Sequence, residues 1–272
     1  MSAAGVPLSS ASSADDAPLV EVEHDAHGVS GVVRLTLNRP DAFNALSEAL
    51  IDALQAQLTG IAKSEARVVV IAAAGRAFCA GHDLREMRAA PSLDYYKRLF
   101  ARCSKMMLTV QTMPQPVIAR VQGVATAAGC QLVAMCDLAV AAESARFAVS
   151  GINLGLFCST PAVPLTRNVS RKAAFEMLMT GEFIDAQKAL REGLVNRVVA
   201  ADELDAAVSA LAASICAKPR EAVAAGKGLF YRQLEMGIEA AYQLAGQTMA
   251  CNMMTDPALD GVQAFIEKRS GK

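Results

Sequence analysis

The stretch Gln122–Asp137, QGVATAAGCQLVAMCD, runs from a turn of small residues into an apolar segment that carries a single amide, Gln131. The small side chains from Gly123 to Gly129 are typical of a tight turn, and the apolar residues that follow predict a short, buried helix. A buried amide normally has a hydrogen-bond partner or a function. This stretch therefore raises the question of why residue 131 is an amide rather than an acid or an aliphatic residue.

Strand and helix patterns alternate on both sides of this stretch. Apolar and β-branched runs predict strands at residues 32–37, 67–73, 116–121 and 137–142, and helical spacing predicts helices after Ser47 and at residues 93–112. This alternation predicts an α/β fold whose loops gather at one edge of the sheets, where ligands usually bind. From about Pro161 the pattern is almost wholly helical, which predicts a helical layer that packs on neighbouring subunits.

The composition predicts a globular protein and excludes some classes of partner. With 272 residues, of which 53% are hydrophobic, the chain can bury a large core. Lys and Arg number 26 against 27 Asp and Glu, so no charge excess favours nucleic acid or an anionic membrane as a partner. We divide the chain into a disordered leader at 1–18, an α/β core at 19–200 and a C-terminal helical region at 201–272.

The seven cysteines are scattered along the chain and form no C-x-x-C pair, so they predict no metal site. This scattered pattern fits cysteines that stay reduced. In addition, no Lys or Arg precedes Arg34, and this absence of N-terminal positive charge argues against a secretory or transit peptide. We therefore expect a cytoplasmic location.

Three segments together resemble the crotonase superfamily, the enoyl-CoA hydratase/isomerase family. They are LNRPDAFNALS at 37–47, GRAFCAGHDL at 75–84 and QGVATAAGCQLVAMCD at 122–137, and the resemblance extends over roughly residues 20–269. It implies a crotonase-like spiral of repeated strand-strand-helix units with a C-terminal helical trimerisation region. It also implies a homotrimer or a dimer of trimers that binds acyl-CoA thioesters, with coenzyme A as part of the substrate and no further cofactor.

The resemblance assigns an oxyanion hole to the backbone N–H groups of His82 and Ala128. Two such donors stabilise the enolate-like transition state of a thioester, by on the order of 3 kcal/mol each. Ala128 stands where the family more often has glycine, but its N–H is retained. The resemblance assigns no role to the ring of His82, which can serve the structure, face solvent or enter the pocket.

Gln131 and Gly151 occupy the positions of the two glutamates that hydratases of this superfamily use to activate water. An amide has no useful protonation equilibrium near neutral pH, and glycine offers no functional group, so classical hydration should be weak. Restoring both glutamates should raise hydration if the scaffold still places them against the enoyl group. Two alternatives are a malonyl-type acyl-CoA decarboxylase, which needs mainly enolate stabilisation, and a non-catalytic acyl-CoA-binding or partner-binding module; we favour an enzyme of non-classical or low activity.

The resemblance also implies a set of substrate-binding residues. They are Ala42, Ala80, His82, Asp83, Leu84, Arg85 and Ala128, together with Phe265 and Lys268 of the terminal AFIEKR element. Arg85 is a candidate for the CoA phosphates, with Arg88, Lys97, Arg98, Arg102 and Lys105 nearby in sequence. For Cys158, just past the second missing glutamate, we expect inert packing, because no base or cationic partner is evident.

Overall fold

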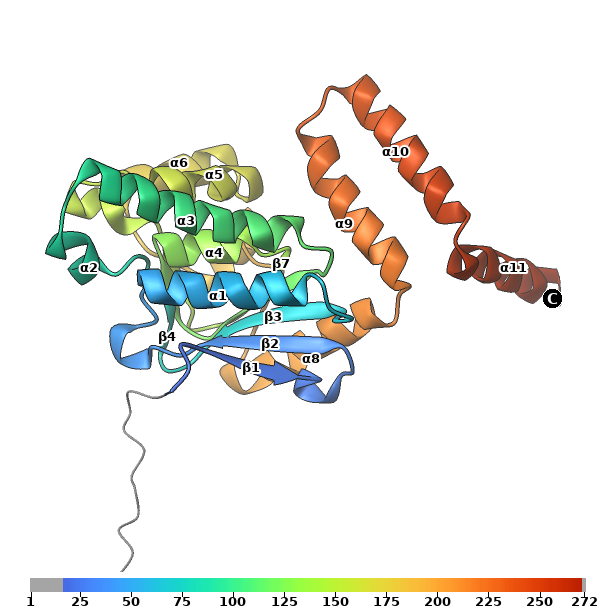
Figure 1. Ribbon diagram of the computed structural model, residues 1–272, viewed down its shortest axis with the longest axis horizontal. Helices are drawn as coiled ribbons and strands as arrows, with labels where there is room; N and C mark the ends of the chain where they lie inside the picture. The colour runs from blue at the N-terminus through green and yellow to red at the C-terminus, as the bar shows by residue number, and fades with distance from the viewer. Residues whose placement is uncertain (1–16, 271–272) are drawn as a thin grey trace, which may run out of the picture.

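The computed structural model describes residues 17–270 (Figure 1). All but the last two residues of the leader expected at 1–18 lie outside this range. Two sheets and the helices around them form the body of the molecule, from which the last helices extend to one side.

A six-stranded sheet with the order β1-β2-β3-β5-β7-β10 forms the centre of the fold. Its strands are β1 (Val20–His24), β2 (Val32–Leu37), β3 (Val68–Ala73), β5 (Val117–Val121), β7 (Leu138–Ala142) and β10 (Arg197–Val199). All neighbouring strands are parallel except β1, which is antiparallel to β2. Every residue of β3 is buried, as its uninterrupted apolar sequence predicts for a strand covered on both faces.

A second sheet, of four short strands, runs beside the first. It contains β4 (Ala77–Cys79), β6 (Val124–Thr126), β8 (Arg146–Ala148) and β9 (Ile184–Asp185), in the order β4-β6-β8-β9. In each of the pairs β3/β4, β5/β6 and β7/β8, the first strand belongs to the large sheet and the second to the small sheet. Helices follow each pair. The expected repeat of strand-strand-helix units is thereby confirmed.

Helices α1 (Glu48–Ile61), α2 (Leu84–Ala89), α3 (Leu93–Thr112) and α4 (Ala128–Met135) follow the first strand units. Helix α1 begins where Ser47 predicts, since the Ser47 hydroxyl accepts a hydrogen bond from the Leu50 N–H at 3.1 Å. Leu50, Leu54 and Leu58 of α1 are fully buried and pack with residues of β2, β3 and α3 in the main core.

The opposite face of the large sheet is covered by α8 (Leu204–Cys216). Leu204, Val208 and Ala212 form a separate core cluster with Val68 and Val70 of β3. Between β8 and α8 the chain forms α5 (Ser159–Asn168), α6 (Arg171–Thr180) and α7 (Ala186–Glu192). The chain after Pro161 is almost wholly helical, as expected; the exceptions are β9 and β10, which are two and three residues long and too short to show a period-two pattern.

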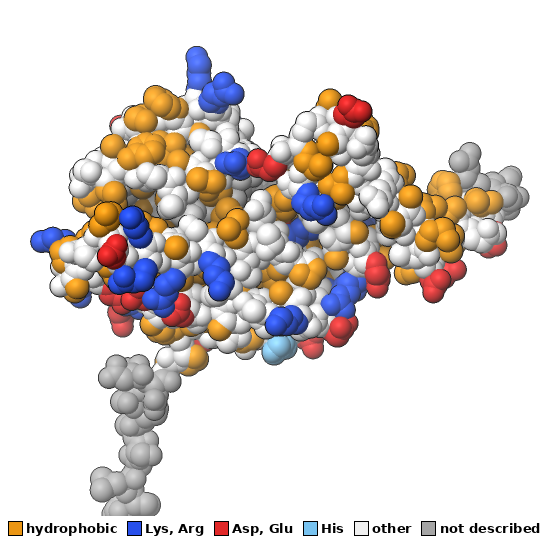
Figure 2. Space-filling model, turned by 45° about the horizontal axis from the view of Figure 1, so that its top comes forward, with side chains coloured by type: hydrophobic (Ala, Val, Ile, Leu, Met, Phe, Trp, Pro, Cys, Tyr) orange, Lys and Arg blue, Asp and Glu red, His pale blue; other side chains and the backbone are white. Residues whose placement is uncertain are grey.

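The chain ends with α9 (Arg220–Leu234), α10 (Ile238–Met253) and α11 (Asp256–Ser270), which extend away from the sheets (Figure 1). Helix α10 packs on α9, and each of the two buries only one residue, Lys227 in α9 and Ala241 in α10. Figure 2 shows many apolar side chains on the surface of this region. Ile238, Tyr242 and Met249 are among its exposed large apolar residues. Within the described part of the chain, no helix combines the length and apolarity that a membrane span requires.

Candidate active site

In the loop between β4 and α2, the backbone N–H of His82 points away from the Leu46 backbone beside it. Leu46 forms an isolated parallel bridge with His82, in which the Leu46 N–H donates to the Gly81 carbonyl at 2.7 Å and the Asp83 N–H donates to the Leu46 carbonyl at 3.1 Å. In such a bridge the N–H of the central residue points to the opposite side. Within residues 17–270 the His82 N–H has no acceptor, so it is available to a ligand.

Helix α4 begins at Ala128 after an unusual backbone conformation at Ala127. Ala127 has φ 50° and ψ −119°, a region that a residue with a Cβ rarely adopts. No side chain caps the helix, so the Ala128 N–H is one of the first-turn donors that lack an intrahelical acceptor. This turn therefore directs the N–H of Ala128 out of the helix at its positive end.

These two segments lie in direct contact because of glycines. A Cβ at Gly81 would lie 2.9 Å from the Cβ of Ala127 and 3.4 Å from the nitrogen of Ala128. A Cβ at Gly129 would lie only 2.1 Å from the carbonyl oxygen of Cys79, so α4 can approach β4 only with glycine at that position. The residue beside His82 and the first turn of α4 thus share one site.

Gln131, one turn along α4 from Ala128, is 4% exposed. Its Oε1 is buried and accepts no hydrogen bond from any group in the described part of the chain. An acceptor buried without a donor typically costs about 1–3 kcal/mol, so this atom is a candidate for contact with a ligand.

The backbone packs closely around Gly151, the residue expected from the resemblance to stand at the position of the second hydratase glutamate. Gly151 lies in a 3-10 turn, η4 (Ser150–Leu154), and its N–H donates to the Sγ of Cys158 at 3.3 Å. A Cβ at this position would lie 2.6 Å from the Leu156 carbonyl oxygen and 2.7 Å from that Sγ. A glutamate substituted at residue 151 therefore cannot be placed against a bound enoyl group without moving the loop, because backbone atoms partly fill the space that its Cβ would need.

The ring of His82 packs edge-on against Phe100 of α3, with their centroids 5.5 Å apart. Both ring nitrogens are buried and lack a partner of good geometry among residues 17–270. Burial lowers the pKa of His82 to about 4, an effect that the nearby Leu46 backbone opposes only in part. The imidazole is therefore neutral at physiological pH and presents one donor and one acceptor.

Asp83 has a structural task, as the N-cap of α2. Its carboxylate accepts hydrogen bonds from the Arg85 and Glu86 N–H groups at 3.1 and 3.4 Å and pairs with Arg39 at 3.1 Å. Burial alone would raise the pKa of Asp83, but these hydrogen bonds and the Arg39 charge outweigh it and lower the pKa. Leu84 and Arg85 are exposed on α2, where they remain free to meet a ligand.

The other predicted binding residues divide into two groups. Ala42 ends a 3-10 turn, η3 (Pro40–Ala42), and Ala80 donates its N–H to the Phe43 carbonyl at 3.1 Å, so both lie beside the His82 loop. Phe265 and Lys268 lie on α11, at the far end of the chain from α2 and α4 (Figure 1). A single chain thus does not bring them to the site.

Among the basic residues considered for the CoA phosphates, Arg102 is already paired. It forms ion pairs with Glu48 and Asp52 of α1 and so connects α1 to α3. Its guanidinium is therefore committed to packing two helices.

Three features of the site were not identified from the sequence. Ala127 gives no sign of its positive φ, and Arg39 gives no sign of its pairing with Asp83 across 44 residues. The contact between Cys158 and Gly151 depends on how η4 folds back. Burial raises the pKa of the Cys158 thiol, which agrees with the packing role expected for it.

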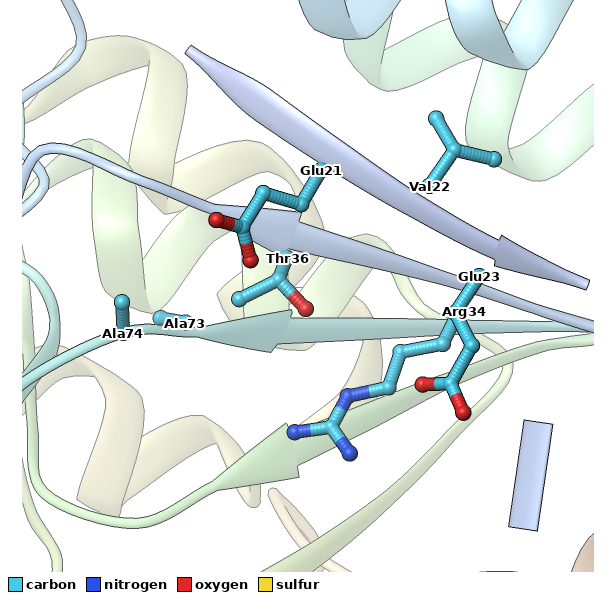
Figure 3. A pocket seen from close by; sticks show the side chains of 7 residues that line it. All are labelled: Glu21, Val22, Glu23, Arg34, Thr36, Ala73 and Ala74. Carbon is cyan, nitrogen blue, oxygen red and sulfur yellow. The ribbon is translucent and has the colours of Figure 1, made fainter. Parts of the chain in front are cut away.

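A separate pocket of about 430 Å³ contains none of the predicted site residues. It lies on β1–β3 and the start of the next loop and is lined by Glu21, Val22, Glu23, Arg34, Thr36, Ala73 and Ala74 (Figure 3). The described residues form no group of three or more His, Cys, Asp or Glu side chains suited to a metal ion.

Comparison with known proteins gives matches over almost the whole chain. The model of the enoyl-CoA hydratase/isomerase family matches residues 27–272. The chain is 45% identical to the enoyl-CoA hydratase domain-containing protein 3 of Rattus norvegicus over 88% of this chain and 80% of that protein. Its fold is similar to an enoyl-CoA hydratase of Mycobacterium smegmatis, with a TM-score of 0.90 and 64% identity over 93% and 97% of the two chains. The human enoyl-CoA hydratase domain-containing protein 3 gives a TM-score of 0.88 and 42% identity over 92% and 98%.

The relatives correct one expectation and establish another. The rat and human proteins are named mitochondrial, which contradicts the cytoplasmic location expected from the cysteines. Reduced thiols indicate only that a compartment is reducing, so they do not distinguish the cytoplasm from another reducing compartment. The resemblance inferred from the three segments is confirmed by the family match, and the chain belongs to the enoyl-CoA hydratase/isomerase family.

Proposed function

We propose that this protein binds acyl-CoA thioesters and stabilises the enolate form of the bound acyl group through the backbone N–H groups of His82 and Ala128. The observation that carries the proposal is the contact between two segments that each expose an N–H without an acceptor in the described chain. As negative charge develops on the thioester oxygen, two fixed donors and the positive end of α4 stabilise it without reorganisation.

Classical hydration is expected to be weak in this site. Gln131 has no proton to give or take near neutral pH, and the Gly151 backbone is covered by Leu156 and Cys158. Each general acid-base group typically contributes about 10²- to 10⁴-fold, so hydration of crotonyl-CoA should fall roughly four orders of magnitude or more below that of a two-glutamate enzyme. Vigorous hydration by the pure protein would contradict this assignment.

The C-terminal helices support a proposal about assembly. Their exposed apolar side chains and the distance of Phe265 and Lys268 from α2 and α4 fit a homotrimer, or a pair of trimers. In such an assembly α11 of one subunit would contribute to the CoA site of its neighbour.

Binding and carbonyl polarisation test the proposal without depending on turnover. Calorimetry with butyryl-CoA, crotonyl-CoA and free CoA should show saturable binding of the acyl thioesters. The infrared frequency of a ¹³C-labelled thioester carbonyl should fall on binding, because two N–H groups donate to its oxygen. A folded protein that binds no acyl-CoA would contradict the proposal.

A matched pair of substitutions at the first residue of α4 isolates one donor. Ala128→Gly keeps the N–H, whereas Ala128→Pro removes it at a helix position that tolerates proline. Only the proline variant should lose most of the carbonyl shift, and thermal unfolding of both variants reports whether they fold. Turnover assays with enoyl- and malonyl-type CoAs then separate an enzyme from a binding module.

A further inference from the structure

The pocket on β1–β3 is lined by charges of both signs (Figure 3). Its polar side chains are Glu21 and Glu23 of β1 and Arg34 and Thr36 of β2. In the antiparallel pairing of these strands, Glu21 lies opposite Thr36 and Glu23 lies opposite Arg34. Because alternate residues of a strand share a face, these four side chains project from the same face of the sheet.

Helix α8 covers only part of this face. Val32, two residues before Arg34 in β2, packs in the cluster that α8 forms with the sheet. Asp205, in the first turn of α8, has its Oδ1 3.6 Å from the Nη1 of Arg34. On the β1 side of Arg34 the face is left uncovered, and the pocket of about 430 Å³ lies there, with Ala73 and Ala74 also in its lining. The pocket is therefore open to a small molecule.

Arg34 and Glu23 do not form an ion pair with each other, although opposite charges at facing positions of a sheet normally attract. The guanidinium of Arg34 instead faces Asp205, whose carboxylate already accepts two hydrogen bonds from Arg120, at 2.7 and 2.8 Å. Among the described residues, the Arg34 side chain and the Thr36 hydroxyl have no hydrogen-bond partner, and Glu23 has no ion pair. Both signs of charge in the pocket are thus available to a ligand.

The net charge of the pocket is negative. Glu21 and Glu23 contribute two negative charges and Arg34 contributes one positive charge, while the neighbouring aspartate of α8 and the second arginine neutralise each other. In Figure 3 the Arg34 guanidinium and the Thr36 hydroxyl lie between the two carboxylates. A complementary ligand therefore has one anionic group and two cationic groups.

We propose that this pocket binds a dibasic α-amino acid such as L-lysine. The carboxylate of the amino acid accepts hydrogen bonds from the Arg34 guanidinium and the Thr36 hydroxyl, and its two ammonium groups pair with Glu21 and Glu23. The pocket volume lies in the range of small-molecule sites, about 300–1,000 Å³. The pocket contains none of the residues that we propose to bind the thioester, so this proposal does not depend on the proposed function.

Saturation-transfer NMR on the full-length protein at low ionic strength tests the proposal with L-lysine and two analogues. L-Norleucine lacks the side-chain ammonium group, and cadaverine lacks the carboxylate. L-Lysine should bind with a Kd on the order of 1 mM, because its charged contacts are partly exposed, and each analogue should bind roughly fivefold more weakly. No saturable binding of L-lysine at about tenfold this concentration, or an equal affinity for either analogue, would overturn the proposal.

Two substitutions assign the groups of the ligand to the charges of the pocket. Arg34→Met should lower the affinity for L-lysine roughly fivefold without weakening cadaverine, which has no carboxylate to lose its partner. Glu23→Gln should weaken L-lysine and cadaverine alike, because both use two ammonium groups. A loss of cadaverine binding in Arg34→Met equal to the loss of L-lysine binding would overturn the assignment of the carboxylate.

Arg191→Met and Glu221→Gln are the matched controls, because both residues are exposed and lie outside the pocket. Both variants should keep the wild-type affinity for L-lysine. Equal affinities in the pocket variants and in the controls, with thermal unfolding showing that all four are folded, would also overturn the proposal. Binding of butyryl-CoA should be the same in all four variants, so its absence would contradict only the proposed function.

Discussion

At residue 151, the hydrogen that replaces a side chain allows a carbonyl and a thiol to pack directly on the backbone. If residue 151 stands at the position of a hydratase glutamate, as we propose, that position now lacks more than a functional group. The Leu156 carbonyl and the Cys158 Sγ lie where a Cβ would be, so the loop is built around glycine. A pocket that has closed in this way resists reversal by a single substitution.

Gly151→Ala should lower the free energy of unfolding by about 1–3 kcal/mol, because the new Cβ would meet a backbone oxygen that cannot move freely. Gly226→Ala is the matched control, since no atom lies within 4 Å of its Cβ position in α9 and alanine favours helix by up to about 1 kcal/mol. Urea denaturation measures both. The double variant Gln131→Glu, Gly151→Glu should gain no hydration of crotonyl-CoA, and a gain of a hundredfold in a folded double variant would refute this account.

His82 should make stability depend on pH. Because the pKa of its ring in the folded protein is lowered from 6.5 to about 4, only the unfolded chain takes up this proton between those values. The stability present above pH 6.5 is thus lost progressively as the pH falls toward 4, by on the order of 3 kcal/mol in full.

Chemical denaturation at several pH values between 7 and 4.5 measures this dependence in the wild type and in His82→Phe. The variant should show a clearly smaller loss of stability over this range. Burial also lowers the pKa of His27, but that residue is common to both proteins and its effect cancels in the difference. Identical pH profiles for the two proteins would show that the ring of His82 is solvated.

At the scale of elements, one buried ion pair connects α9 to the core. The Nζ of Lys227 donates to the Val110 and Gln115 carbonyls, each at 2.8 Å, and to the Asp137 carboxylate at 2.7 Å. Tyr231, one turn later, donates its hydroxyl to the same carboxylate at 2.8 Å. All three donors of this ammonium group are satisfied, so the contact ties the middle of α9 to the core.

Lys227→Met should lower the free energy of unfolding by about 3–5 kcal/mol, since it leaves the Asp137 carboxylate buried without its cation. Tyr231→Phe removes one hydrogen bond and keeps the ion pair, so it should cost about 1 kcal/mol. Hydrogen exchange in α9–α11 should accelerate strongly only in the lysine variant. Equal effects of the two substitutions would show that the ion pair does not hold the helix.

The sequence predicts those parts of the fold that depend on local patterns. The β-branched run at 68–73 and the cap at Ser47 specify β3 and the start of α1, and both are where the sequence predicts them. β9 and β10 are too short for a pattern and exist because the chain pairs with β8 and β7. In the site, the segments follow from the family motifs, whereas the conformation of Ala127 and the packing around Gly151 depend on contacts between segments distant in sequence.

At the scale of the whole molecule, the C-terminal helices expose several large apolar side chains, and a group of such side chains often marks an interaction surface. Ile238, Tyr242 and Met249 of α10 are 76%, 74% and 70% exposed. Such side chains are typical of the core of an interface between subunits.

Light scattering should therefore give the mass of three or six chains at micromolar concentration. Tyr242→Glu combined with Met249→Glu should shift the protein toward smaller species, because each places a charge in the apolar contact. Gln243→Glu combined with Gln247→Glu adds the same charge at polar positions of α10 and should leave the mass unchanged. A wild-type monomer would show that these helices have no role in assembly.

The strand order of the large sheet also bears on how the chain folds during synthesis. From β1 to β10 each strand lies beside the one that precedes it in this sheet, so every new strand leaving the ribosome finds its partner already made. The carboxylate of Asp137, however, gains its cation only when Lys227, 90 residues later in the chain, has been synthesised. A nascent chain that stops short of α9 therefore contains every strand of the sheet together with an uncompensated buried charge, and synthesis of α9 supplies the missing cation.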